Sequence, residues 1–169
     1  GRVARMVDTP GHLLGDRQMS EDIGKVDAAC FEEHIYPNLG AERESIAIGP
    51  RHGIDFGVLE VGSKRLVVAS DPISIQPALG FRRAGELALH SVLSDVAISG
   101  IPPSFLSVNL MLPMEMTDAE FAEFWEGIAA ECEELGIGLL SGHTARQDVS
   151  YPWVGGATAM GVGDPDEIV

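Results

Sequence analysis

Lysine is scarce in this sequence. Its 169 residues contain 11 Lys and Arg against 26 Asp and Glu, a formal net charge of -15, and the lysines are Lys25 and Lys64. So few cations leave no basic stripe for a nucleic-acid backbone, which argues against DNA or RNA as a partner. Because the acids are scattered, they favour a halophilic cytoplasm, where carboxylates keep a protein hydrated, over a preference for cationic ligands.

Long apolar runs and targeting signals are also missing. No stretch approaches the roughly 18 apolar residues of a transmembrane helix, and no signal-peptide pattern opens the chain. The two cysteines, Cys30 and Cys132, show no CxxC or Cys/His spacing. We interpret them as buried thiols of a reducing compartment, with one disulfide as the alternative. The sequence therefore predicts a soluble, cytoplasmic protein without a membrane partner.

Several common catalytic motifs are absent. There is no GxxxxGK[ST], GxGxxG or GxSxG pattern, which argues against a P-loop, a dinucleotide fold and a serine hydrolase. The five histidines lack the spacing of metal ligands, so a histidine metal site is not expected.

What is present predicts an α+β fold. Residues 1–22 mix Pro, Gly and charge and predict a flexible arm, whereas residues 23–169 predict one domain. Apolar periodicity indicates a mostly antiparallel or mixed sheet layered with two long helices. The expected helices cover 26–39, 82–98 and 117–135, and the expected strands cover 58–61, 65–69, 105–112, 137–140 and 153–162.

Three aspartates interrupt their local patterns. Asp55 follows a glycine-rich loop, Asp71 precedes a proline that we expect to end a strand, and Asp95 lies near the C-terminal end of an apolar helix, where the helix dipole disfavours an acid. Separated carboxylates suit Mg²⁺ bound together with substrate phosphates better than they suit zinc. The alternative is three unrelated aspartates that cap turns or face water.

A second candidate follows the expected strand 137–140. Gly142, His143 and Thr144 offer backbone N–H groups and a hydroxyl that suit phosphate contacts, and an ordinary tight turn is the alternative interpretation.

Taken together, these segments resemble the N-terminal domain of the aminoimidazole ribonucleotide synthetase superfamily. The resemblance rests on Gly49 to Asp55, Ser70-Asp71, the Leu93-Ser94-Asp95 stretch through Gly100 and Pro102, strand 105–112 and Gly142-His143-Thr144. The superfamily includes selenophosphate synthetase, thiamine-monophosphate kinase and a hydrogenase-maturation protein that dehydrates a carbamoyl group.

The resemblance implies an ATP-dependent enzyme acting on a small molecule. It would activate an amide or carbamoyl oxygen with a phosphoryl group or deliver that group to an acceptor, as a homodimer whose sheets form a shared barrel. Asp55, Asp71 and Asp95 would then organise Mg²⁺, Lys25 would be catalytic, and the nucleotide would contact Gly49, Gly53, Gly142, His143 and Thr144.

The sequence also departs from the superfamily pattern. Kinase-like members have paired acids where this chain has Ile54-Asp55-Phe56, and an acid where it has His143. The reactive cysteine in the N-terminal arm of selenophosphate synthetase has no counterpart here, because residues 1–29 contain no Cys. The hydrogenase-maturation protein needs a cysteine in a C-terminal tail, and this sequence contains no such tail.

The family's second domain is absent from this sequence. We therefore expect the N-terminal part of a longer enzyme, inactive alone, whose C-terminal domain lies in cis. The alternatives are a stand-alone dimerising nucleotide-binding module and a structural domain whose acids are only halophilic surface charge.

Overall fold

The computed structural model describes residues 23–169, so the arm predicted for residues 1–22 lies outside it. The chain divides into two compact units, with the boundary between Asn38 and Leu39. In the N-terminal unit, α1 (Ala28–Cys30) continues as a π-helical turn, Phe31–Ile35, and a 3-10 turn, Tyr36–Asn38. Asp27 caps this segment by accepting a hydrogen bond from the Cys30 backbone N–H at 2.7 Å. The helix predicted here is confirmed, but it is less regular than its periodicity indicates.

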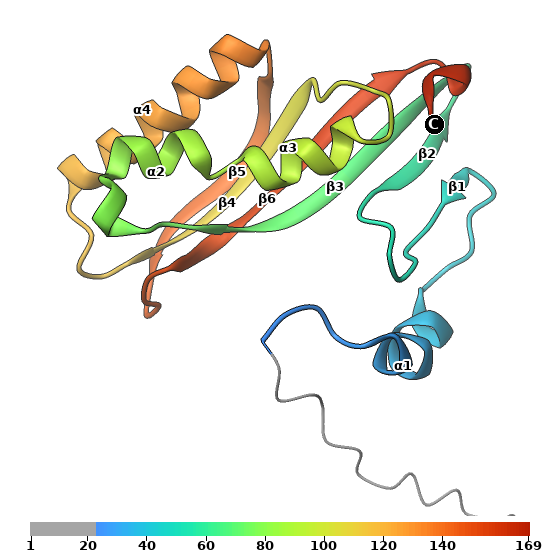
Figure 1. The fold of residues 1–169 in the computed structure, drawn as a ribbon, viewed down its shortest axis with the longest axis horizontal. Coiled ribbons are helices and arrows are strands. Elements are labelled where there is room, and N and C mark those ends of the chain that lie inside the picture. The colour runs from blue at the N-terminus through green and yellow to red at the C-terminus, as the bar shows by residue number, and fades with distance from the viewer. Residues whose placement is uncertain (1–22) are drawn as a thin grey trace, which may run out of the picture. The chain divides into compact units, whose positions relative to one another are not determined.

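The second unit is built on an open six-stranded sheet (Figure 1). Its strand order is β1-β2-β3-β6-β4-β5, and all neighbours are antiparallel except the parallel pair of β4 and β5. The strands are β1 (Ile46–Ile48), β2 (Gly57–Val61), β3 (Lys64–Ser74), β4 (Phe105–Pro113), β5 (Gly138–Gln147) and β6 (Trp153–Gly163). The mixed α+β fold predicted from the sequence is confirmed.

Strand β3 is longer than the sequence analysis predicts. We expected Pro72 to end it and to leave Asp71 at its tip, but pairing with β6 continues through Pro72 and Ile73. The last pair between β2 and β3 joins Gly57 to Val68, so β3 is an edge strand beyond that point. A proline is tolerated at such an edge because no second neighbour needs its missing N–H.

The helix predicted for residues 82–98 is broken into two. Helix α2 (Phe81–Leu87) ends at Ala88, whose N–H donates to the Gly85 carbonyl, and α3 (His90–Ala97) begins after the buried Leu89. The break lets the two helices pack differently, since α2 lies along α4 (Asp118–Leu135) while α3 lies on β3 and β6 (Figure 1).

Helices α2 and α4 approach closely through two glycines. A Cβ atom at Gly85 would lie 2.0 Å from the Phe124 carbonyl oxygen, and one at Gly127 would lie 2.2 Å from the Arg82 carbonyl oxygen. Real Cβ atoms do not come this near to backbone. Only glycine therefore permits this spacing, which sets the position of α2.

Helix α4 begins and ends as its sequence predicts. The Thr117 hydroxyl accepts from the Glu120 N–H at 3.2 Å, and the Glu120 carboxylate accepts from the Thr117 N–H at 2.7 Å, which completes a capping box. Gly136 ends the helix with a positive φ of 70°.

The core lies between the sheet and the helices. Side chains of a strand alternate between its two faces, so Val67, Ala69 and Ile73 of β3 point to the helix-covered face and are buried. Asp71 belongs to the same alternate set, which places a carboxylate on the helix-covered face at the end of the core. No helix in the described part of the chain is long and apolar enough to cross a membrane.

Candidate functional site

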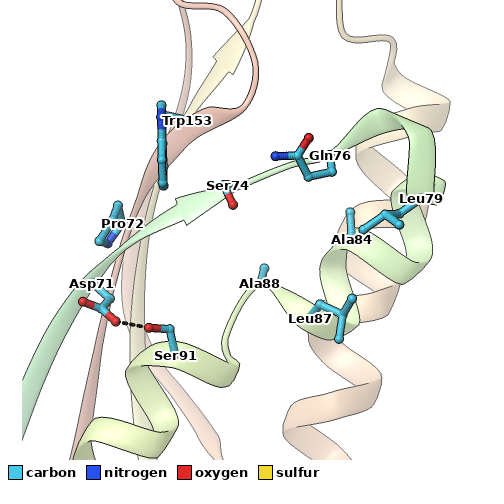
Figure 2. Close-up of a pocket in the computed structure, with 10 residues that line it drawn as sticks. All are labelled: Asp71, Pro72, Ser74, Gln76, Leu79, Ala84, Leu87, Ala88, Ser91 and Trp153. Carbon is cyan, nitrogen blue, oxygen red and sulfur yellow. Dashed lines mark hydrogen bonds between the residues drawn. The ribbon is translucent and has the colours of Figure 1, made fainter. Parts of the chain in front are cut away.

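The Asp71 carboxylate is paired with a helix. Ser91, in the first turn of α3, donates its hydroxyl hydrogen bond to Oδ2 of Asp71 (Figure 2). Asp71 is half-buried, whereas Ser91 is exposed at the helix surface. A carboxylate accepts several hydrogen bonds through its two oxygens, so this bond orients the group and leaves it capacity to bind a cation.

A cavity of about 330 Å³ opens beside this pair (Figure 2). Its wall combines the end of β3, the start of β6 and the α2 region, and it mixes apolar with polar side chains. The lining residues are Asp71, Pro72, Ser74, Gln76, Leu79, Ala84, Leu87, Ala88, Ser91 and Trp153. A pocket of this size and composition is typical of a small-molecule site.

Asp95 lies on the same side of α3 as Ser91. The two residues are four apart in one helix, which brings their Cβ atoms to within about 5–6 Å of each other. Asp95 is half-buried, as Asp71 is. The hydrogen bond from Ser91 thus connects Asp71 to the face of α3 that carries Asp95.

Asp55 lies on neither β3 nor α3. It is exposed in the loop that leads into β2, and the first residue of that strand, Gly57, pairs with Val68, three positions before Asp71. Three elements therefore carry the predicted aspartates: a loop, a strand and a helix.

The three acids do not form a complete metal cage. Among residues 23–169, no group of three or more His, Cys, Asp and Glu side chains could hold a metal ion. Mg²⁺ does not need such a group, because it usually binds through one or two carboxylates with waters and substrate phosphates. The hard oxygen donors of Asp71 and Asp95 fit that chemistry.

The segment Gly142 to Thr144 is part of a strand. We considered a turn here, but these residues lie within β5, at the edge of the sheet. Asp71 pairs with Ala157, Ala157 with Val108 and Val108 with Gly142, so three strand spacings, about 14 Å, separate Asp71 from Gly142. A single chain does not bring the two segments into one pocket.

The other predicted residues lie outside the Asp71 pocket. Gly53 adopts a φ of 86° in the turn closed by the Arg51–Ile54 bridge, and Gly49 lines a separate surface pocket near β1. Lys25 is exposed and precedes α1 in the N-terminal unit. The roles of these residues stay predictions.

The uncovered face of the sheet carries a row of hydroxyl groups. Ser70, Thr158, Ser107 and Ser141 are successive partners across β3, β6, β4 and β5. The Ser70 and Thr158 hydroxyl oxygens are 2.7 Å apart, and these two residues and Ser107 line a cavity of about 340 Å³. The row depends on strand register, which the sequence alone does not reveal.

The other residues of the Asp71 pocket are not among the site residues predicted from the sequence. Ser91 was visible as the residue four positions before Asp95, and helical spacing could have placed it beside that acid. Gln76 and Trp153 line one cavity because β6 returns beside β3, which places Trp153 opposite Ser74.

Both cysteines are free thiols, and Cys132 is buried in α4 while Cys30 is half-buried. Burial is the main cause that raises the pKa of Cys132, with a smaller contribution from the negative charge of Glu131. A buried thiol of this kind is typical of a structural cysteine.

Comparison with protein families decides the relationship. The model of the AIR synthase related protein, N-terminal domain, matches residues 53–163, which is more than half of the chain. The chain belongs to this family. The match runs from the loop before β2 to the end of β6 and includes all three aspartates and the Asp71 pocket.

Individual members of the AIR synthase related family show the same relationship. The carbamoyl dehydratase HypE of Azotobacter vinelandii is 33% identical over 92 residues, which are 53% of this chain and 27% of the relative. The thiamine-monophosphate kinase of Stenotrophomonas maltophilia K279a superposes with a TM-score of 0.56 and 27% identity, covering 76% of this chain and 40% of the kinase.

A structure of the hydrogenase maturation protein HypE in complex with ATP shares the fold. Its TM-score is 0.52 at 21% identity, covering 61% of this chain and 32% of HypE. This AIR synthase related domain thus spans about a quarter to two fifths of its matched relatives.

Proposed function

We propose that this chain is the ATP- and Mg²⁺-binding N-terminal domain of an enzyme that phosphorylates a small substrate. The reaction would activate an amide or carbamoyl oxygen or transfer the phosphoryl group to a small acceptor. The observation that carries the proposal is the Asp71–Ser91 pair at a ligand-sized cavity, within a chain of the AIR synthase related family. Relatives named carbamoyl dehydratase and a HypE structure with ATP support it.

Each residue of the candidate site would have its own role in phosphoryl transfer, whose catalysis consists mainly of positioning the reactants and neutralising their charge. Asp71 and Asp95 would hold Mg²⁺, with Asp55 reaching it from the loop before β2. Ser91 is a positioning residue, since its hydroxyl fixes the orientation of the Asp71 carboxylate. Bound Mg²⁺ would neutralise phosphate charge, and the catalytic role of Lys25 stays a prediction from the family resemblance.

A second copy of the chain completes this proposal. As an edge strand, β5 directs the backbone N–H groups of alternate residues in the Gly142 to Thr144 segment away from β4, and such groups suit phosphate oxygens, but β5 lies three strands from Asp71. In a homodimer, β5 of one protomer would serve the nucleotide held by its partner. Such an interface is supported by exposed apolar side chains on the uncovered face of the sheet, namely Val61, Phe105, Met111 and Val162.

The domain would bind nucleotide without completing the reaction. Because the chain matches only part of its relatives, we assign acceptor binding to a C-terminal domain in cis, and we expect no turnover from residues 1–169. The alternative is a dimerising nucleotide-binding module without catalysis.

Calorimetric titration of the full chain with ATP, in high salt with Mg²⁺ and then with EDTA, tests the proposal. We expect binding that requires Mg²⁺ and that weakens about tenfold or more in Asp71→Asn, because a charged metal ligand is lost. Glu123→Gln on the exposed surface of α4 removes the same charge away from the pocket and is the control. Unaltered affinity in Asp71→Asn, or no heat with the wild type, would refute the proposal.

A further inference from the structure

We propose that residues 164–169 form a strap that holds α3 in position along β3, so that the contact between Ser91 and Asp71 depends on this strap. Residues at one end of the sheet would thereby control the geometry of the acids assigned to the metal. The inference rests on the proposed function only for its effect on nucleotide binding, because the contacts that carry it involve neither metal nor ATP.

Strand β3 and helix α3 are joined at two separate places. At one of them, the Ser91 hydroxyl donates to the Asp71 carboxylate. At the other, the strap contacts the start of β3 at residues 64–65 and the turn after α3 at residues 99–100 (red, at the C mark of Figure 1). Ser99 follows Ser91 by eight positions, about 12 Å at the rise of a helix. A helix held in two places this far apart resists sliding along the strand.

The strap contacts the end of α3 through backbone atoms. The Val169 N–H donates to the Ser99 carbonyl oxygen at 3.0 Å. A Cβ atom at Gly100 would lie 2.2 Å from the Glu167 carbonyl oxygen, and Gly100 has a positive φ of 94°. Both the conformation and the close approach of the strap therefore require glycine at position 100.

The Ser99 side chain fixes the end of α3 internally. It is the only polar side chain that is fully buried among residues 23–169. Its hydroxyl donates to the Val96 carbonyl oxygen at 2.7 Å and accepts from the Ile101 N–H at 3.2 Å. These two bonds join the last turn of α3 to the residues that lead into β4, so a displacement at Ser99 is passed to the helix.

The strap is attached to β3 and to the core by different kinds of contact. The Lys64 ammonium donates to both carboxylate oxygens of Asp164 at 2.8 Å. The Arg65 guanidinium donates to the Pro165 carbonyl oxygen at 3.3 Å. Lys64 and Asp164 are exposed, and salt screens such a pair, so it contributes little. We therefore assign most of the attachment to Ile168, which packs against the core, and to the backbone bond with α3.

A matched pair of substitutions tests the strap without altering the core. Val169→Pro removes the N–H that donates to Ser99, whereas Val169→Ala keeps it. The Val169 side chain is 93% exposed, so its loss alone should have no effect. The preceding residue, Ile168, has an extended backbone with φ −80° and ψ 126°, which a following proline requires.

Hydrogen exchange of the α3 amides is the direct measurement. In Val169→Pro these amides should exchange about 2- to 10-fold faster than in the wild type, the range that the loss of one hydrogen bond predicts. Val169→Ala should exchange as the wild type does. Gly100→Ala places a Cβ atom against the strap and should produce a larger increase. Unaltered exchange in Val169→Pro would overturn the inference, whatever Gly100→Ala does.

A double-mutant cycle separates positioning from general destabilisation. Val169→Pro should weaken ATP-Mg²⁺ binding about 2- to 10-fold in calorimetry. In a Ser91→Ala background the contact with Asp71 is already lost, so Val169→Pro should have a smaller effect on the Kd there. Equal effects in the two backgrounds would show that the strap does not act through Ser91 and would overturn the inference.

The outcomes separate this inference from the proposed function. If the wild type binds no ATP-Mg²⁺, the proposed function is wrong, and the exchange of the α3 amides still decides whether the strap holds the helix. If the wild type binds ATP-Mg²⁺ and Val169→Pro binds it equally well, the strap does not control the site, and the proposed function stands.

Discussion

The glycine contact between α2 and α4 predicts that alanine at position 127 lowers the stability of the protein, although alanine has a higher helix propensity than glycine. In a free helix, replacing Gly127 by Ala stabilises by about 1 kcal/mol. Here the new Cβ would lie 2.2 Å from the Arg82 carbonyl oxygen and 2.9 Å from the Glu86 backbone nitrogen, so α2 must move by roughly 1 Å to restore ordinary contacts. Such overpacking costs about 1–3 kcal/mol, occasionally more.

Because the clash is with two backbone atoms of α2, the cost should lie at the upper end of that range, so Gly127→Ala should destabilise the protein by about 2 kcal/mol net. It would lower the melting temperature by about 4–8 °C for a chain of this length. Because α2 and its C-cap residue supply Ala84, Leu87 and Ala88 to the pocket wall, the same variant should bind ATP-Mg²⁺ more weakly.

Thermal unfolding followed by circular dichroism measures the first effect. Glu123→Ala, at an exposed position of the same helix, is the control and should leave the melting temperature within about 1–2 °C of the wild type. A Gly127→Ala variant that melts at or above the wild-type temperature would show that the two helices are not held at the spacing described.

Three further predictions use other contacts. Ser91→Ala should weaken ATP-Mg²⁺ binding several-fold in calorimetry, because the Asp71 carboxylate loses the hydrogen bond that orients it. Ser91→Thr keeps a hydroxyl and should bind as the wild type does. Equal affinity in all three proteins would show that Ser91 does not position Asp71. The Tyr151 hydroxyl is buried and has no hydrogen-bond partner among residues 23–169, so Tyr151→Phe should raise the melting temperature by a few degrees, and a lower value would contradict this. Burial raises the pKa of the Cys132 thiol, so the folded protein keeps the thiol proton to a higher pH than the unfolded chain does. The protonated thiol therefore contributes fully to the free energy of unfolding below the unfolded pKa, and this contribution is lost as the pH rises through the folded pKa. Melts between about pH 8 and 11 should therefore show a smaller loss of stability in Cys132→Ala than in the wild type.

Local signals in the sequence predicted those parts of the fold that local physics decides. The Thr117–Glu120 capping box and Gly136 mark both ends of α4, and each works through atoms a few residues apart. Alternating apolar residues likewise predicted β4, because one of its faces is buried.

The errors arose where distant segments decide the structure. Pro72 was predicted to end β3, but β6 continues to pair with it because β2 has already ended. The helix over residues 82–98 was predicted as continuous, but packing of α2 on α4 and of α3 on the sheet divides it at Leu89.

The candidate site shows the same division. Asp71 and Asp95 were recognisable because each interrupts an apolar pattern in its own segment. Their connection through Ser91 and the position of Trp153 opposite Ser74 depend on tertiary packing and strand register, which one sequence does not encode locally.

The most direct test of the central claim is a thermal melt of the full chain at high salt, with and without excess ATP-Mg²⁺, for the wild type and Asp95→Ala. Ligand at about 100 times its Kd adds roughly 2.7 kcal/mol to stability, which is a shift of several degrees. A shift in the wild type that is lost in Asp95→Ala is the predicted result. An unshifted wild type, or equal shifts in both proteins, would contradict the assignment of these acids to a metal–nucleotide site.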